Sequence, residues 1–181
     1  MRIVSGSARG RKLITPEGMD IRPTTDKVKE AMFSIIQFDL QNKSILDLFA
    51  GTGQLGIEAL SRGAKKVTFV DSSKKARELV KKNLELTGFS GLASLVPNDS
   101  FAFLQNTPER FDIVILDPPY ENGMCEKAAS FLPSVLKDDS IVICETRPDE
   151  RLPEEIGKLR IAKEYLYSGI KLTVYRNSEE Q

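Results

Sequence analysis

The stretch ILDLFAGTGQLG, residues 45–56, places the pattern Gly-x-Gly-x-x-Gly directly after an apolar run and at the opening of a helical pattern. Gly51, Gly53 and Gly56 permit a tight turn and let the backbone approach a ligand closely. Asp71 ends the next apolar run, 20 residues after Gly51, where a carboxylate can accept hydrogen bonds from both hydroxyls of a ribose. The order of strand, glycine turn, helix and acid therefore predicts a cofactor site on a βα unit.

Outward from this stretch, short apolar runs alternate with helical patterns. A helix-like stretch follows each of the first four runs, and Gly63 and Gly88 stand where two of these helices would end. Continuous Val/Ile/Leu runs separated by helices are typical of parallel strands covered on both faces. We therefore expect an α/β, Rossmann-like fold with strands at residues 44–49, 66–71, 93–97, 111–117 and 140–145.

The last part of the chain has a different pattern. Residues 159–167 and 170–176 resemble two strands, and Ser168-Gly169 between them is a hairpin signal. The sequence thus predicts that a C-terminal antiparallel hairpin joins the mostly parallel sheet.

The first 22 residues differ in charge from the rest. Residues 1–15 carry Arg2, Arg9, Arg11 and Lys12 and no acid, a local charge of +4. Glycines between these cations let the backbone approach a partner. We predict that residues 1–22 form a basic N-terminal arm, folded as a hairpin, and that this arm is a contact surface.

A proline boundary at Arg22-Pro23 separates this arm from a domain over residues 23–181. Thr24, Thr25 and Asp26 are residue types that cap helices. Apolar residues then recur on one face of an amphipathic helix, at Val28, Ala31, Met32, Ile35 and Ile36.

The net charge of zero, from 26 basic and 26 acidic residues, is a sum of opposite regions. Residues 62–82 have a local charge of +6, and residues 138–155 have a local charge of −5. Association depends on the local field rather than on the total charge, so neutrality does not exclude a nucleic-acid partner. A solvated helix face is the favoured interpretation of residues 62–82, and the arm is the better candidate for a contact.

Residues that are absent exclude several chemistries. The chain has no histidine, so Ser-His-Asp catalysis, His-ligated zinc and imidazole acid–base catalysis are ruled out. Cys125 and Cys144 form no CxxC pair, which indicates reduced thiols rather than a metal or redox site. No apolar run has the length of a signal peptide core or a membrane span. We expect a soluble cytoplasmic monomer with no metal and no membrane contact.

Asp117-Pro118-Pro119-Tyr120 follows the fourth apolar run. Ligands of open α/β sheets bind at the carboxyl ends of strands, so this turn should face the same crevice as the glycine turn. The prolines lack N–H groups, which leaves a rigid turn dominated by acceptors. The Asp117 carboxylate and the Pro118 carbonyl could accept from the amine of a base while Tyr120 stacks on its ring. Such acceptors would direct the lone pair of the amine at a methyl donor, a catalysis by alignment that needs no histidine.

The glycine pattern alone suits both NAD and S-adenosylmethionine. The chain has one such pattern and adds no separate substrate domain, and the acceptor turn suits methylation of an amine. Asp47 could attract the ammonium group of the methyl donor, with Phe49 beside it, and Asp99 could accept from the adenine amine. These observations favour S-adenosylmethionine, and a dinucleotide-binding protein remains the alternative from another class.

In combination, these motifs resemble class I S-adenosylmethionine-dependent methyltransferases that act on an amino nitrogen. The segments at residues 2–13, 22–33 and 47–60 are similar to those of the RsmD family, bacterial enzymes that methylate guanine N2 in small-subunit ribosomal RNA. The sequence Arg-Pro-Thr-Thr-Asp at residues 22–26 is the most specific part of this resemblance.

The resemblance implies a seven-stranded methyltransferase sheet and 16S rRNA, within a small ribosomal subunit particle, as substrate. It implies that residues 22–27 lie near the active cleft, with Thr25 at the cofactor. The RNA would then be bound by Arg22 and by the four cations of the arm. Methylation of another amine, such as adenine N6 in DNA or RNA or a protein glutamine, stays open, because Asp-Pro-Pro-Tyr recognises an amine and not the molecule that carries it.

Overall fold

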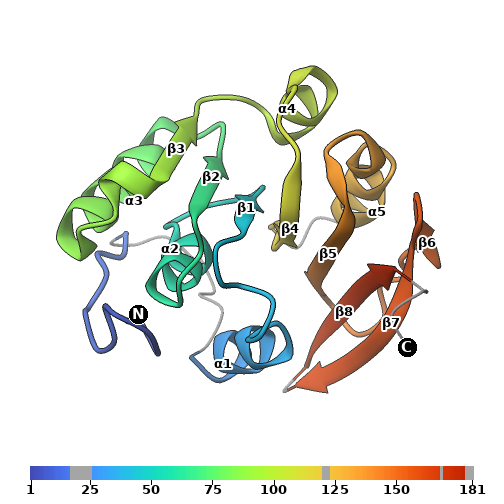
Figure 1. Ribbon diagram of the computed structural model, residues 1–181, viewed down its shortest axis with the longest axis horizontal. Helices are drawn as coiled ribbons and strands as arrows, with labels where there is room; N and C mark the ends of the chain where they lie inside the picture. Colours follow the sequence, from blue (N-terminus) through green and yellow to red (C-terminus); the bar gives the residue numbers. More distant parts are fainter. Residues whose placement is uncertain (17–25, 120–122, 168, 178–181) are drawn as a thin grey trace.

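The computed structural model describes residues 1–16, 26–119, 123–167 and 169–177 (Figure 1). Within these ranges it has one sheet with helices on both faces. The strands are β1 (Ser44–Asp47), β2 (Lys66–Val70), β3 (Ala93–Val96), β4 (Phe111–Leu116), β5 (Leu136–Thr146), β6 (Glu155–Ile156), β7 (Leu159–Tyr167) and β8 (Ile170–Asn177). The helices are α1 (Asp26–Ile35), α2 (Gln54–Ser61), α3 (Lys74–Thr87), α4 (Ser100–Asn106) and α5 (Met124–Ala129), with 3₁₀ turns η1 (Ser90–Leu92) and η2 (Leu132–Ser134).

The strand order β3-β2-β1-β4-β5-β8-β7-β6 defines a doubly wound sheet with an antiparallel end. Strands β1 to β5 pair in parallel, β8 pairs antiparallel with β5, and β7 pairs antiparallel with β8. The predicted α/β fold with its C-terminal hairpin is therefore confirmed. The order reverses direction between β1 and β4, the position where ligands bind in open sheets.

The sheet has an eighth strand, which the sequence did not predict. The two-residue strand β6 pairs Glu155 and Ile156 with the start of β7. Only one of its two residues is apolar, so β6 forms no apolar run from which a strand could be predicted. Its position at the edge of the sheet leaves the predicted arrangement of the other seven strands unchanged.

Two apolar clusters form the core, one on each face of the sheet. Helices α1, α2 and α3 pack in one cluster, around Phe33, Ile57 and Val80. Helices α4 and α5 pack in the other, around Phe103 and Ala128. Figure 1 shows the two sets of helices on opposite sides of the sheet. Because both faces are covered, the central strands are largely apolar rather than alternating.

Glycines end and begin the helices at the predicted places. Gly88 adopts a left-handed conformation, φ 81°, at the C-terminus of α3. Gly53, φ 76°, precedes the first residue of α2. The predicted apolar face of α1 is also present, with Val28 and Met32 buried in the helix and Ile36 buried directly after its end.

Candidate functional site

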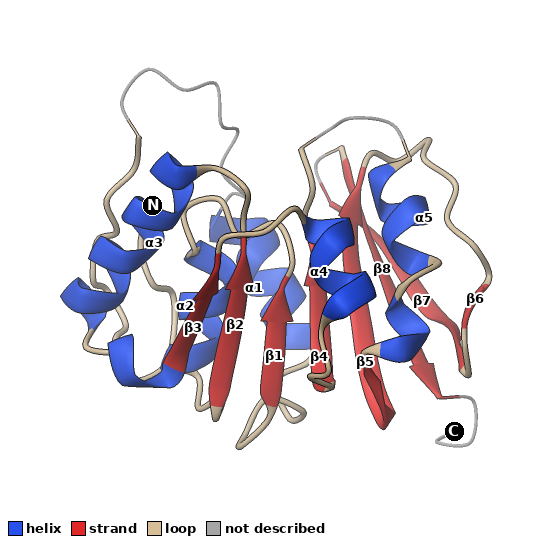
Figure 2. Ribbon diagram, turned by 90° about the horizontal axis from the view of Figure 1, so that it is seen from above, coloured by secondary structure: helices blue, strands red, loops and turns tan. Residues whose placement is uncertain are grey.

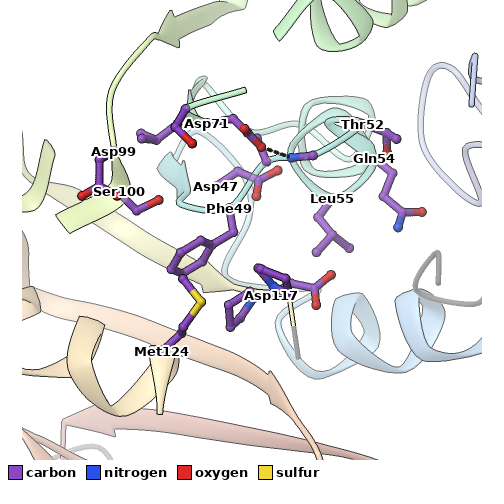
Figure 3. Close-up of a pocket in the computed structure, with 16 residues that line it drawn as sticks. Asp47, Phe49, Thr52, Gln54, Leu55, Asp71, Asp99, Ser100, Asp117 and Met124 are labelled. Carbon is purple, nitrogen blue, oxygen red and sulfur yellow. Dashed lines mark hydrogen bonds between the residues drawn. The ribbon is translucent and has the colours of Figure 1, made fainter. Parts of the chain in front are cut away.

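A cleft of about 430 Å³ lies at the carboxyl ends of the parallel strands, between β1 and β4. In Figure 2 β1, β2 and β3 point upward, so the carboxyl ends of the parallel strands lie at the upper edge of the sheet in that view. Figure 3 shows the side chains that line it. The lining residues that were predicted from sequence are Asp47, Phe49, Gly51, Asp71, Asp99, Asp117, Pro118 and Pro119.

The three glycines of the glycine turn do not all have the same role: one leaves room for a ligand, and another permits close packing. A Cβ added at Gly51, φ 53°, would meet no atom within 4 Å, so its backbone is open to a ligand. Gly53 and Gly56 are not among the residues that line the cleft. A Cβ at Gly56 would lie 2.2 Å from the ring of Phe69, which shows that this glycine permits close packing of α2 on β2.

Asp71 stands at the end of β2 and holds the glycine turn in place. Its Oδ2 accepts from the N–H of Gly51 at 2.9 Å, and its Oδ1 accepts from the N–H of Ser73 at 2.8 Å. An ionised carboxylate has about four acceptor sites, so these two bonds leave capacity for ligand hydroxyls. The guanidinium of Arg77 donates to the backbone carbonyls of Asp71 and Ser72 and so fixes the turn between β2 and α3 that carries Asp71.

Asp47 lies at the bottom of the cleft with only 1% of its surface exposed. Its Oδ2 accepts from the N–H of Gly56 at 3.0 Å. Burial raises the pKa of Asp47 to about 7, the Gly56 hydrogen bond opposes this shift, and the charges of Asp117 and Asp71 add to it. A cation that enters the cleft would favour the ionised form of this carboxyl.

Asp99 and Ser100 close the side of the cleft at the start of α4. Asp99 caps this helix, because its Oδ1 accepts from the N–H groups of Phe101 and Ala102 at 3.0 and 3.1 Å. The hydroxyl of Ser100 donates to the carbonyl of Leu48 at 2.7 Å, which joins α4 to the end of β1. Asp99 thus has a structural role as a cap and also faces the cleft.

Asp117, Pro118 and Pro119 line the cleft from the end of β4, next to β1 in the sheet. The sequence prediction that the glycine turn and this turn face one crevice is therefore correct for these three residues. Tyr120, predicted to stack on a base, lies outside the described residues, as do Thr25 and Arg22.

Several lining residues were not predicted from the sequence. They share no chemical signature and come from the turns at the strand ends, the adjoining end of β2, or the first residues of α2, α4 and α5: Ala50, Thr52, Gln54, Leu55, Val70, Ser72, Ser100 and Met124. Those of residues 50–55 follow from their place in the glycine stretch. Met124 carried no signal, since its position depends on how α5 packs.

The basic arm packs against α2. The backbones of Arg2 and Lys12 form an antiparallel bridge, and the arm residues Ile3, Ala8 and Leu13 are buried in the core cluster of α1, α2 and α3. A Cβ at Gly6, φ 82°, would lie 1.8 Å from the carbonyl oxygen of Ser61. Backbone and core contacts therefore hold this segment as a packed element.

A buried ion network joins the arm to two helices. Glu58 of α2 is fully buried and accepts from the N–H groups of Val4 and Ser5 at 2.8 and 2.9 Å. It also accepts from Arg62 at 2.8 Å and lies 3.6 Å from the ammonium of Lys29. Burial lowers the pKa of Lys29, and Glu58 opposes that shift. This network was not predicted, because the arm, Lys29 and Glu58 are far apart in sequence.

Four cations of the arm differ in their partners. Arg2 pairs with Asp26 at 3.0 Å, and Arg11 donates to the carbonyl of Leu86 at the end of α3. Arg9 and Lys12 are exposed. These two side chains are the ones most available to an external partner.

Neither a membrane-spanning helix nor a metal-binding cluster is found within the described ranges. No helix there is long and apolar enough to span a membrane. In the same ranges, no group of three or more Cys, Asp or Glu side chains is arranged to hold a metal ion.

The sheet topology, the glycine turn at the switch point and the adjoining Asp-Pro-Pro turn define a class I methyltransferase fold. A family model described as "Conserved hypothetical protein 95" matches residues 1–176. The chain is 42% identical to "Ribosomal RNA small subunit methyltransferase D" of Haemophilus influenzae over 158 residues, covering 84% of this chain and 81% of that protein. The chain therefore belongs to the RsmD family.

Solved structures agree with this assignment. The structure named "Putative methyltransferase yhhF from Escherichia coli" is similar with a TM-score of 0.87 and 32% identity, over 98% of this chain and 97% of that chain. The structure named "SMU.776, a putative methyltransferase complexed with SAH" has a TM-score of 0.66 and 19% identity, over 80% of this chain and 49% of that chain. The second likeness concerns the fold alone.

Proposed function

We propose that this protein transfers the methyl group of S-adenosylmethionine to the exocyclic N2 amine of a guanine in small-subunit (16S) ribosomal RNA. The observation that carries the proposal is the meeting of the Asp117-Pro118-Pro119 turn with the glycine turn in one cleft. Membership of the RsmD family supports a ribosomal RNA substrate.

The charge of the cleft supports a cationic cofactor. Asp47, Asp71, Asp99 and Asp117 line it, and no lysine or arginine occurs among its described lining residues. A dinucleotide would bring a pyrophosphate into this acidic environment, which is unfavourable. S-adenosylmethionine, with a sulfonium and an ammonium, has the complementary charge and supplies an electrophilic methyl group when bound.

The residues fit distinct parts of this cofactor. The open backbone of Gly51 gives close access, and the spare acceptor sites of Asp71 suit two ribose hydroxyls. Asp47 would hold the ammonium group from the bottom of the cleft. Only Oδ1 of Asp99 accepts the two capping bonds, and Oδ2 would accept from the adenine amine.

The Asp-Pro-Pro turn would hold the substrate amine. The carboxylate of Asp117 and the carbonyl of Pro118 would accept its two N–H groups and turn its lone pair toward the methyl group. This turns the lone pair out of conjugation with the base. The methylated amine is acidic and loses a proton to Asp117 or to water. Tyr120 would stack on the base.

Methyl transfer to defined acceptors tests this function. The purified chain and S-adenosylmethionine are incubated with small ribosomal particles from a strain that lacks the gene, with duplex DNA, and with total protein. We expect methylation of the particles alone, recovered as N2-methylguanosine by nucleoside mass spectrometry. Label recovered only as N6-methyladenine, or only in protein, would instead identify another amine as the substrate.

Calorimetry tests the cofactor separately. S-adenosylhomocysteine should bind, and NADH should not. Tight NADH binding without a response to S-adenosylhomocysteine would support the dinucleotide-binding alternative.

A further inference from the structure

Asn83 of α3 joins two segments that have separate parts in the proposed function. The residue is fully buried. Its Oδ1 accepts from the N–H of Ile14 at 2.7 Å, and its Nδ2 donates to the carbonyl of Ile14 at 3.1 Å. The same Nδ2 donates to the carbonyl of Thr52 at 3.0 Å. One side chain thus binds both the basic arm and the glycine turn.

The pairing with Ile14 has the pattern of a backbone pair in a sheet. Both polar backbone groups of Ile14 bond to the one amide, as they would to a neighbouring strand. The amide is therefore well suited to fix the last part of the arm before residue 17. An apolar side chain at position 83 would leave three backbone groups without this partner.

Thr52 lies between Gly51 and Gly53 and lines the cleft. Its hydroxyl donates to the sulfur of Met1 at 3.3 Å, so the other end of the arm also contacts the glycine turn. Val80, one turn before Asn83 on α3, restricts the turn from the same side, because a Cβ at Gly53 would lie 3.1 Å from it. The position of Thr52 therefore depends on both the arm and α3.

We propose that Asn83 is a positioning residue that couples the arm to the cofactor turn, so that cofactor and RNA bind cooperatively. The inference rests on the proposed function, in which the turn binds S-adenosylmethionine and the arm contacts RNA. A cofactor that orders Thr52 also orders Ile14 through one shared amide. By linkage, RNA held by the arm then strengthens cofactor binding by the same factor.

Hydrogen exchange of the full chain tests this coupling without RNA. In the wild-type protein, S-adenosylhomocysteine should slow exchange of the Ile14 amide by at least about fivefold, although the ligand occupies the cleft and not the arm. In Asn83→Ala this response of the arm should disappear while protection of residues 51–56 by the ligand remains. Affinity for S-adenosylhomocysteine should fall by at least about fivefold in the same variant.

Thr87→Ala is the matched control. Thr87 is also buried on α3, but its hydroxyl donates only to the helix carbonyls of Asn83 and Leu84. This variant removes a buried polar group without touching the arm or the turn, so its arm should respond as in the wild type. Thermal unfolding of both variants verifies that they are folded.

The outcomes separate the two proposals. If the wild-type protein binds S-adenosylhomocysteine but the exchange of residues 1–16 does not change, the coupling is wrong and the proposed function stands. An arm response that persists in Asn83→Ala also overturns the coupling. If the wild-type protein does not bind S-adenosylhomocysteine, both proposals fail, and the wild-type measurement decides this even where a variant does not fold.

Discussion

Asp47 is the most buried of the four carboxylates in the cleft, and its protonation links cofactor binding to pH. Its pKa of about 7 lies above the ordinary value of 3.8. The folded chain therefore keeps a proton that the unfolded chain releases between pH 4 and 7. The free energy of unfolding falls as pH rises through this range, by at most about 1.4 kcal/mol per pH unit.

Cofactor affinity should have the opposite pH dependence. An ammonium group favours ionised Asp47, so binding must release the proton when the pH is below 7. We expect the affinity for S-adenosylmethionine, measured by calorimetry from pH 5.5 to 8, to fall by up to about tenfold per pH unit below 7. The chain has no histidine to titrate in this range. Asp47→Asn should abolish this pH dependence. If the affinity of the wild-type protein does not change with pH, Asp47 does not bind the ammonium group.

Asp117 should be needed for the reaction and not for cofactor binding. Asp117→Asn keeps the size of the side chain and removes its charge. We expect the rate of methyl transfer at saturating cofactor to fall at least about 100-fold, because the amine loses its strongest acceptor. The dissociation constant for S-adenosylhomocysteine should change less than about threefold, which is within 1 kcal/mol. Unchanged turnover would remove Asp117 from the mechanism.

Residues of the site could be predicted from the sequence where an acidic residue stands near the end of a predicted strand. Asp47, Asp71, Asp99 and Asp117 each stand within a few residues of a strand end, and the carboxyl ends of parallel strands meet at one edge. Met124 has no such signature, and its place in the cleft follows from tertiary packing. The roles of Gly53 and Gly56 in packing also required the structure, since the pattern does not distinguish access from close contact.

At the scale of elements, the arm is the segment for which the structure adds most to what the sequence predicted. Composition indicated a basic contact surface, and the structure adds that Ile3, Ala8 and Leu13 belong to the core. A pattern of charges could not predict this, because the partners of the arm, Glu58 and Asn83, lie more than 50 residues away. Deleting the arm would remove core residues, so point variants are the better probes.

Two glycines of the arm give a matched test of its packing. Gly6 and Gly10 have φ of 82° and 83°, but only at Gly6 would a Cβ meet the backbone of Ser61. Gly10→Ala should lower the free energy of unfolding by about 1–2 kcal/mol, the cost of a left-handed alanine. Gly6→Ala should lower it by clearly more, as measured by urea denaturation. Equal losses in the two variants would indicate that the arm does not pack on α2 in solution.

The exposed cations of the arm should contribute to RNA affinity through phosphate contacts. Replacing Arg9 and Lys12 by alanine should reduce the slope of log K against log salt by about 1.4, because each of the two phosphate contacts contributes roughly 0.7 on single-stranded RNA. Lys65→Ala with Lys158→Ala is the control, because both lysines are exposed outside the arm and the cleft. An identical slope in the Arg9 and Lys12 variant would make the arm purely structural.

At the scale of the whole molecule, the alternation of apolar runs and helices was enough to predict a mostly parallel sheet with a C-terminal antiparallel hairpin, but not the order of its strands. Each central strand is covered on both faces and is therefore a largely apolar run, which is a strong signal. β6 escaped prediction because two residues carry no pattern. The zero net charge likewise reflects the sum of a basic arm, other basic and acidic segments, and an acidic cleft, and it says little about partners.

The proposed methyl transfer to guanine N2 would leave one modified nucleoside, N2-methylguanosine, in 16S rRNA. Nucleoside mass spectrometry of 16S rRNA, from cells with the gene, without it, and with the Asp117→Asn variant in its place, tests it most directly. We expect the amount of N2-methylguanosine to decrease in the deletion strain, and we expect the wild-type gene to restore it while the variant does not. An unchanged amount of N2-methylguanosine in the deletion strain would contradict the account.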